Sequence, residues 1–325
     1  VDKNIITRNY SNILSVERTP IPQHRWGFIP LSVELFLQIN NSTTLDPANN
    51  TYIKKNETPL LRYGVERSSK QSFVSCIADL YTFHNNIDVP SIKEMKKIII
   101  KHISLDIYKT LQNGNLSSLF QPKKINVSDI EVEKFKNTDL YKSTDLNEPS
   151  QYNALKFTIS SYQNFITFLK DEDSLIDHVF LWDIVCSPNT NLFENGLNLV
   201  IMEVEDYDKR DNITLLCPTN AYSDLLFDSN KGTALILKNK EYYEPIYIYG
   251  STKNDKSSTK TNAIKIFYRD NTPSKLTPIF NNIKNTMNKY CKPNKNRAYK
   301  YKENISLQQL YRELENINFA IHKQI

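Results

Sequence analysis

The order of periodic patterns along the chain predicts an α+β protein in which helices pack on one mixed β-sheet. Between residues 73 and 185, apolar side chains recur every three or four positions, which is the spacing of a buried helix face. After residue 197, short β-branched and aromatic runs alternate with turns rich in Asn, Asp, Gly and Lys. Helices that come first and strands that follow indicate this class.

Two helices are expected in the first half of the chain. Apolar residues over 73–83 recur at intervals of three and four, which favours a buried helix. Ser91 and Glu94 then form an S-x-x-E capping box, the usual start of a helix. We expect this second helix to extend to Ile107 and to be closed by Asn113-Gly114.

Two more helices are expected before the strands begin. One covers residues 159–169. The other is expected to be capped by Ser174, with Asp177 three positions on, and to run over residues 179–185. Residues 121–150 are rich in Lys, Asp and Asn without clear periodicity, so we expect an insertion or loop there.

Five short runs carry the strand signal, each rich in β-branched or aromatic residues and bounded by turn residues. They are residues 197–204, 213–217, 233–237, 245–249 and 263–268. Together these runs predict the sheet.

Three parts are predicted along the chain. Residues 1–60 are expected to form an irregular arm, because the prolines at positions 20, 22 and 30 and the polar run 40–50 interrupt any long element. Residues 61–270 hold the periodic patterns and form the predicted α+β domain. Residues 271–325 form a predicted basic, helical C-terminal extension, and we expect the chain to belong to a longer polypeptide.

The composition argues against several kinds of site. With six glycines and neither GxxxxGK nor GxGxxG, the chain lacks the usual loops for ATP or a dinucleotide, so no cofactor is expected. The cysteines show no CxxC or Cys/His spacing, so no metal site is expected and all are expected to be reduced and mostly buried. They are Cys76, Cys186, Cys217 and Cys291.

The surroundings of the protein can also be predicted. No window approaches the roughly 20 apolar residues of a membrane span, and no signal peptide opens the chain, so we expect no membrane contact. Reduced thiols indicate a cytoplasmic location. The bias towards Asn, Lys, Ile and Tyr is expected of an AT-rich genome and is similar to that of proteins from large DNA viruses, which would mean the host cytoplasm or the virion.

A basic block near the C-terminus suggests nucleic acid. No acidic residue occurs between Asp270 and Glu303, while lysines and arginines alternate there with tyrosines. Cations mixed with stacking rings suit a phosphate backbone or single-stranded bases. The alternative is a solvated linker or surface helix. The candidate binding residues are Lys292, Lys295, Arg297, Lys300 and Lys302.

The polar loop 64–71 leads directly into the first helix, with Ser72 and Cys76 at the junction. A nucleophile at a helix N-terminus gains from the positive end of the helix dipole, and a polar loop can supply backbone N–H groups as an oxyanion hole. A nucleophile also needs a base. The histidines are His24, His84, His102, His178 and His322.

Residues 70–77 and 241–243 carry a resemblance to a known family. Lys70-Gln-Ser-Phe-Val-Ser-Cys-Ile77 resembles the D-G-x-C-[LF]-x-x-[AS]-[IL] motif at the central helix of the ovarian tumour (OTU) deubiquitinases, which are papain-like cysteine proteases. The alignment puts Ser72 at the nucleophile. The run 233–237 with Glu241-Tyr242-Tyr243 is similar to the family's penultimate strand and His-aromatic pair, which puts Tyr242 at the His.

This resemblance covers roughly residues 60–250 and implies a papain-like, OTU-like fold whose catalytic positions have degenerated. Its implied function is a non-catalytic, pseudo-deubiquitinase module for protein interaction, with ubiquitin as one candidate partner. The alternatives are an active thiol hydrolase and a nucleic-acid-binding domain. The hydrolase would use Cys76 or Ser72, with a base from His24, His178 or His322.

Two further patterns leave alternatives open. Acidic residues near predicted strands could hold Mg²⁺ in a nuclease, but the Lys that such a site needs is missing at the right offset, and a turn explains them equally well. These acids are Asp183, Glu203, Glu205, Asp206 and Asp208. Crowded aromatic residues indicate either a recognition surface or sheet packing. They are Tyr222, Phe227, Tyr242, Tyr243, Tyr247 and Tyr249.

Overall fold

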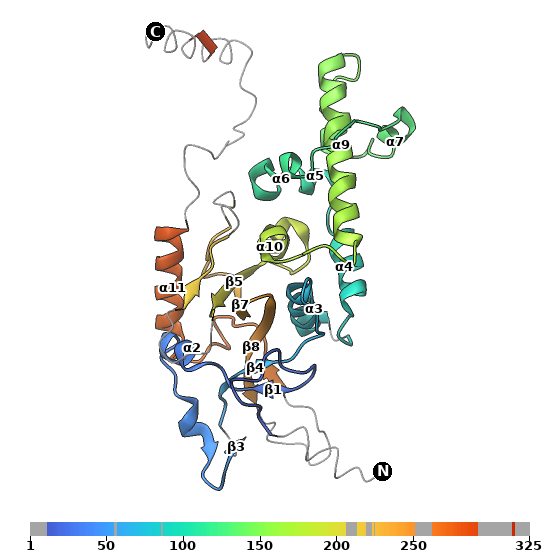
Figure 1. Cartoon of the computed structure of the whole chain (residues 1–325). Coiled ribbons are helices and arrows are strands. Elements are labelled where there is room, and N and C mark those ends of the chain that lie inside the picture. The colour runs from blue at the N-terminus through green and yellow to red at the C-terminus, as the bar shows by residue number, and fades with distance from the viewer. Residues whose placement is uncertain are drawn as a thin grey trace, which may run out of the picture.

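The computed structural model describes residues 12–54, 57–85, 87–205, 213–218, 223, 225–250, 262–291 and 314–315. Within them the chain forms helices around a mixed, seven-stranded β-sheet (Figure 1). The predicted arrangement of helices on a mixed sheet is therefore confirmed. No helix in these ranges has the length and apolar character needed to cross a bilayer.

The sheet has the order β1-β4-β8-β7-β5-β6, with β9 also paired to β8. Strands β5 and β7 run parallel, and the other pairs described are antiparallel. A separate hairpin joins β2 to β3. The bounds are β1 Trp26–Gly27, β2 Leu45–Asp46, β3 Asn49–Ile53, β4 Leu60–Tyr63, β5 Leu197–Glu203, β6 Thr214–Leu215, β7 Gly232–Asn239, β8 Tyr242–Gly250 and β9 Asn262–Ile264.

All five strands predicted after residue 197 are present, but the sheet also takes β1 and β4 from the first 63 residues. These two strands are short and almost wholly buried, so they lack the alternating pattern that marks a half-exposed strand. Because β1 and β4 lie in the same sheet as β8, residues on both sides of position 60 share one core. The three predicted parts of the chain stay a prediction.

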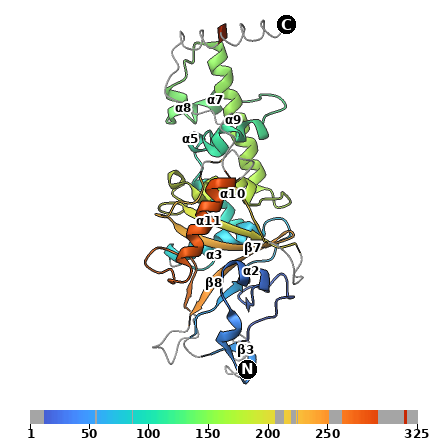
Figure 2. The same ribbon diagram turned by 90° about the vertical axis from the view of Figure 1, so that its left-hand side faces the viewer.

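The helices lie on both faces of the sheet. Helices α3 and α10 cover one face, and α2 and α11 cover the other (Figure 1, Figure 2). Helix α9 packs against α4 and against the short helices α5 and α6. The bounds are α2 Leu31–Phe36, α3 Ser72–Asn85, α4 Ile92–Lys101, α5 Leu105–Tyr108, α6 Leu116–Leu119, α7 Asp129–Glu133, α8 Asp139–Lys142, α9 Pro149–Lys170, α10 His178–Cys186 and α11 Thr277–Tyr290, with 3₁₀ turns at Asn41–Thr44, Leu111–Gly114 and Pro188–Thr190.

The capping box of Ser91 and Glu94 is confirmed at the start of α4. The expected extension to Ile107 is wrong, because α4 ends at Lys101 and Ser104 caps a new helix, α5. The cause is a nearby residue: the side chain of Ser104 accepts a hydrogen bond from the backbone N–H of Ile107, and this cap starts a new helix.

The cap of α10 also differs from the expectation. Asp177 accepts the hydrogen bond from the N–H of Val179, whereas the hydroxyl of Ser174 donates to Asp171. Residues 121–150 contain two short helices rather than a plain loop. The signal for α7 was in the sequence, since Ser128 and Glu131 form a capping box.

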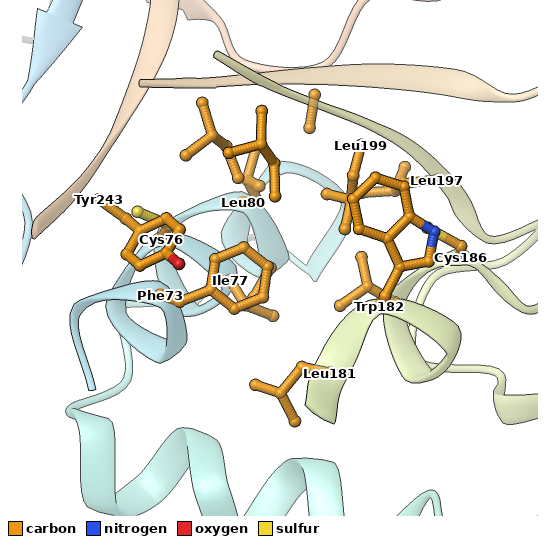
Figure 3. Close-up of a cluster of buried hydrophobic side chains, with 14 of the residues drawn as sticks. Phe73, Cys76, Ile77, Leu80, Leu181, Trp182, Cys186, Leu197, Leu199 and Tyr243 are labelled. Carbon is orange, nitrogen blue, oxygen red and sulfur yellow. The ribbon is translucent and has the colours of Figure 1, made fainter. Parts of the chain in front are cut away.

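The core lies between α3, α10 and the sheet. Figure 3 shows Phe73, Ile77 and Leu80 of α3 facing the same interior as Trp182 of α10 and Leu199 of β5. All five side chains are buried. Strands β5 and β7 are buried on both faces, which explains their nearly continuous apolar sequences.

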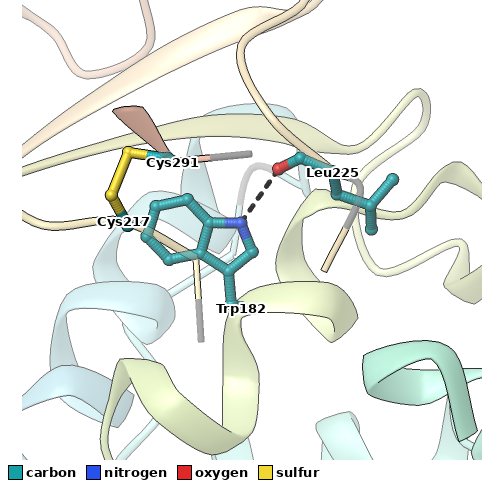
Figure 4. The surroundings of a disulfide bond; sticks show 4 residues. All are labelled: Trp182, Cys217, Leu225 and Cys291. Carbon is teal, nitrogen blue, oxygen red and sulfur yellow. Dashed lines mark hydrogen bonds between the residues drawn. A yellow bond between two sulfur atoms is a disulfide. The ribbon is translucent and has the colours of Figure 1, made fainter. Parts of the chain in front are cut away.

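A disulfide between Cys217 and Cys291 corrects the expectation that every cysteine is reduced (Figure 4). The two residues are 74 positions apart, so no local spacing could reveal the pair. The bond links the edge of the sheet after β6 to the end of α11, close to Trp182. Cys76 and Cys186 are free and buried, as expected.

A buried ion pair joins β4, near the N-terminal end of the chain, to β8. Arg62 on β4 donates to the carboxylate of Glu244 on β8 over 2.8 Å, and both side chains are shielded from water. The remaining N–H groups of Arg62 bond to the N-terminal segment: to the carbonyls of Ser15, Val16 and Phe28 and to the hydroxyl of Thr19. Glu244 accepts a further hydrogen bond from the N–H of Ile21.

Arg62→Met is expected to lower the free energy of unfolding by about 3–5 kcal/mol, because Glu244 would remain buried without its counter-charge. Adding Glu244→Leu is expected to recover only part of this loss, since the carbonyls at positions 15, 16 and 28 would still lack their donor. Urea denaturation followed by circular dichroism measures both. Full recovery in the double variant would contradict the anchoring of the N-terminal segment by Arg62.

Candidate functional site

The N-terminus of α3 meets the turn between β7 and β8. The hydroxyl of Ser72, the first residue of α3, donates to the carbonyl of Glu241 over 3.0 Å and accepts from the N–H of Tyr243 over 3.1 Å. These two bonds flank Tyr242. The residues aligned with the family's nucleophile and histidine thus lie next to each other, although about 170 positions separate them.

Ser72 has the contacts of a structural residue. It is 3% exposed, and its proton is engaged by a backbone carbonyl. Serine needs a base that accepts this proton before it can attack a substrate. Among the described side chains, no histidine is hydrogen-bonded to Ser72 or Cys76.

The histidines make other contacts. His24 bonds to the hydroxyl of Tyr63, and His102 bonds to the carbonyl of Thr190. His178 bonds through Nδ1 to the hydroxyl of Tyr243 over 2.8 Å. The side chain of His84 and the whole of His322 lie outside the described part of the chain.

Cys76 lies one turn into α3 and is fully buried, as Figure 3 shows. Burial raises the pKa of its thiol well above the ordinary value, and the carboxylates of Glu244 and Asp79 raise it further. The thiol therefore stays protonated at neutral pH. A protonated, buried thiol is a poor nucleophile, so Cys76 is a core residue.

Two backbone N–H groups of the loop before α3 already have an acceptor within the loop. The backbone N–H groups of Lys70 and Gln71 both donate to the hydroxyl of Ser68. The side-chain amide of Gln71 donates to the carbonyls of Asp171, Glu172 and Ser174, which fastens the loop 171–176 beside α3. These polar groups stabilise the junction.

His178, Tyr243 and Phe73 form a small cluster beside Ser72. The ring of Phe73 meets both others edge-on, with centroids 6.3 Å from His178 and 5.2 Å from Tyr243. Burial lowers the pKa of His178 below its ordinary value of 6.5, although the charges of Asp177 and Glu203 oppose this. Burial likewise raises the pKa of the Tyr243 hydroxyl. Both groups are neutral at pH 7. Tyr243 was missed as a partner, because only the tertiary structure brings it to His178.

The acidic residues do not assemble a metal site in the part of the chain that is described. Glu203 forms an ion pair with Lys238, and the carboxylate of Asp183 accepts from the N–H of Gln112 and from Ser223. Each therefore has a structural partner. Glu205 is exposed. Asp206 and Asp208 lie outside the described residues.

Two sets of predicted site residues remain: the crowded aromatic residues and the basic residues near the C-terminus. Tyr243 and Tyr247 are buried in the sheet, which is the packing alternative, while Tyr242 is partly exposed and Tyr222 lies outside the described residues. The basic candidates also lie outside the described residues. They are Lys292, Lys295, Arg297, Lys300 and Lys302.

Ser72→Ala is expected to lower the free energy of unfolding by about 1–3 kcal/mol, because it leaves the buried N–H of Tyr243 without an acceptor. Ser75→Ala is the matched control: the Ser75 hydroxyl is buried one turn later in the same helix and has no hydrogen-bond partner among the described residues. Ser75→Ala should be neutral or stabilising. Equal losses of stability in both variants, measured by urea denaturation, would refute the bridging role of Ser72.

The lowered pKa of His178 predicts a pH dependence. The unfolded chain binds a proton to this residue near pH 6.5, whereas the folded protein resists it, so folding is most favoured above pH 6.5. Wild-type stability should therefore fall relative to that of His178→Gln as the pH drops from 7.5 towards 5. Urea denaturation at each pH measures this difference. Parallel stability curves would argue against a buried, neutral His178.

Comparison of the chain with protein-family models, with curated proteins and with solved structures finds no match. A function for this chain must therefore be argued from its own residues. The best-defined feature is the junction at Ser72, where α3, β8 and the loop 171–176 meet.

Proposed function

We propose that this chain is a non-catalytic protein-interaction module with an OTU-like scaffold. One observation supports this most directly: Ser72 bridges Glu241 and Tyr243 around Tyr242. In the resemblance, these positions hold a nucleophile at a helix N-terminus and a histidine on the facing strand. Here they hold a serine and a tyrosine whose contacts stabilise the fold.

The chemistry of the junction supports a lost activity. The hydroxyl of Ser72 donates to a carbonyl instead of a base, and the thiol of Cys76 is buried and protonated. A hydrolase needs an activated nucleophile and a group that accepts its proton. Neither requirement is met among the described residues, so we favour the module over the thiol hydrolase.

The surface beside the junction suits a protein partner. The guanidinium of Arg67 lies 5.8 Å from the ring centroid of Tyr242, and Leu175 on the adjacent loop is 55% exposed. Tyrosine and arginine are enriched at the energetically important positions of protein interfaces. Tyrosine buries much area at a small cost in side-chain entropy, and the planar guanidinium of arginine supplies five hydrogen-bond donors. Ubiquitin is the first candidate partner, on the resemblance alone.

An electrophilic ubiquitin probe tests the absence of catalysis. We expect no covalent adduct with the folded wild-type protein, because no activated nucleophile is available. Intact-mass spectrometry measures this, with Ser72→Ala and Cys76→Ala as matched variants. An adduct with the wild-type protein that disappears in either variant would show an active hydrolase and refute the proposal.

Titration of ¹⁵N-labelled ubiquitin with the unlabelled chain tests the partner. Shifts of ubiquitin resonances are expected, with an affinity that falls about tenfold or more in Arg67→Ala and Tyr242→Ala. The control is Tyr290→Ala, which removes an exposed tyrosine of α11, on the face of the sheet opposite α3. This variant should bind ubiquitin like the wild type. An absence of shifts would exclude ubiquitin as the partner.

A further inference from the structure

The outer side of α11 is polar and free of acidic residues. The helix buries Ile279, Phe280, Ile283 and Met287 against the sheet. Its exposed side carries amides, hydroxyls, a lysine, a proline and a tyrosine, and no Asp or Glu occurs anywhere in the helix. The exposed residues are Thr277, Pro278, Asn281, Asn282, Asn285, Thr286, Lys289 and Tyr290.

In the described part of the chain, the cations around α11 form no ion pair with a carboxylate. Elsewhere in the described residues, Lys70, Lys93, Lys109 and Lys156 each form an ion pair with a carboxylate. No such pair is described for the cations near α11. Lys231 donates to the carbonyl of Cys186 and Lys284 to the hydroxyl of Ser229, both neutral acceptors. These cations are Lys231, Arg269, Lys275, Lys284 and Lys289.

A surface pocket extends this cationic side. It is lined by Ser229, Asn230, Lys231, Tyr268, Arg269 and Asp270. The bond between Lys284 and Ser229, 3.3 Å long, places α11 at its rim. Asp270 is its one acidic lining residue and is exposed. At the other end of the helix, the ring of Tyr290 is 69% exposed and lies 4.8 Å from the ammonium of Lys289.

We propose that this α11 surface binds the backbone of single-stranded nucleic acid. The surface comprises Lys231, Arg269, Lys275, Lys284, Lys289 and Tyr290. Unpaired cations favour phosphates because binding releases counterions without first breaking an ion pair within the protein. The asparagine amides can donate to phosphate oxygens, and an exposed tyrosine gives a base a ring to stack on. At 14 residues, α11 offers a track about 20 Å long.

The α11 surface is independent of the junction at Ser72. Helix α3 and helix α11 lie on opposite faces of the sheet (Figure 1, Figure 2). The proposal therefore does not rest on the OTU-like reading, and either can fail without the other.

Fluorescence anisotropy with labelled dT20 and U20 oligonucleotides, from 50 to 200 mM KCl, tests the proposal. The test variant changes Arg269, Lys275, Lys284 and Lys289 to Gln. The control changes the ion-paired Lys70, Lys93, Lys109 and Lys156 to Gln, so both variants lose four positive charges. Circular dichroism checks that both fold.

We expect the test variant to bind at least about tenfold more weakly and to lose up to about 3 from the slope of log K against log salt, or about 0.7 for each phosphate contact. Tyr290→Ala should weaken binding about tenfold. The control should change both quantities much less. The affinities for dT20 and U20 show whether the surface prefers DNA or RNA.

Four outcomes would overturn the proposal. The first is no binding by the wild-type chain. The second is an equal loss of affinity in the test and control variants, which would mean that the net charge of the protein, and not the position of the charges, determines the affinity. The third is an unchanged slope in the test variant, which would place the contacts outside this surface. The fourth is equal affinity for a 20-base-pair duplex, which would exclude recognition of a single strand.

Discussion

The ion pair of Arg62 and Glu244 is the constraint on which the rest of the structure depends. It lies where β4 meets β8, and its side chains are removed from water. A buried guanidinium must find an acceptor for each N–H group, and Arg62 finds them in the carboxylate, three backbone carbonyls and a hydroxyl. The path of the N-terminal segment is therefore fixed by the hydrogen-bonding needs of one side chain.

Strand β8 contacts the Arg62 network on one face of the sheet and helices α3 and α10 on the other. Glu244 holds β8 from the side of the N-terminal segment, while Tyr243, the adjacent residue, bonds through its N–H to Ser72 and through its hydroxyl to His178. Neighbouring residues of a strand point to opposite faces, so one strand can serve two sets of contacts. The position of α3 on the sheet follows from this.

The ionisable groups on the two faces of the sheet differ in their charge at neutral pH. Around α3, burial keeps the thiol of Cys76, the imidazole of His178 and the phenol of Tyr243 neutral. Around α11, Lys275 and Lys289 are exposed, Lys231 and Lys284 are half-buried, and none of them has a carboxylate partner among the described residues. Low dielectric on one face suits a rigid scaffold, and solvated positive charge on the other suits an anionic partner.

Local signals in the sequence determined the elements themselves. The capping box at Ser91, the strands after residue 197 and the burial of Cys76 each depend on a few neighbouring residues, so they could be predicted. The approach of Ser72 to Tyr242 was predicted only through an alignment, and the hydrogen bonds of Ser72 to Glu241 and Tyr243 were not predicted. Tertiary structure alone decided the entry of β1 and β4 into the sheet, the pairing of Arg62 with Glu244, and the disulfide of Cys217 with Cys291. The reason is that helix and strand periodicity act over a few positions, whereas these contacts join segments whose approach depends on how the whole core packs.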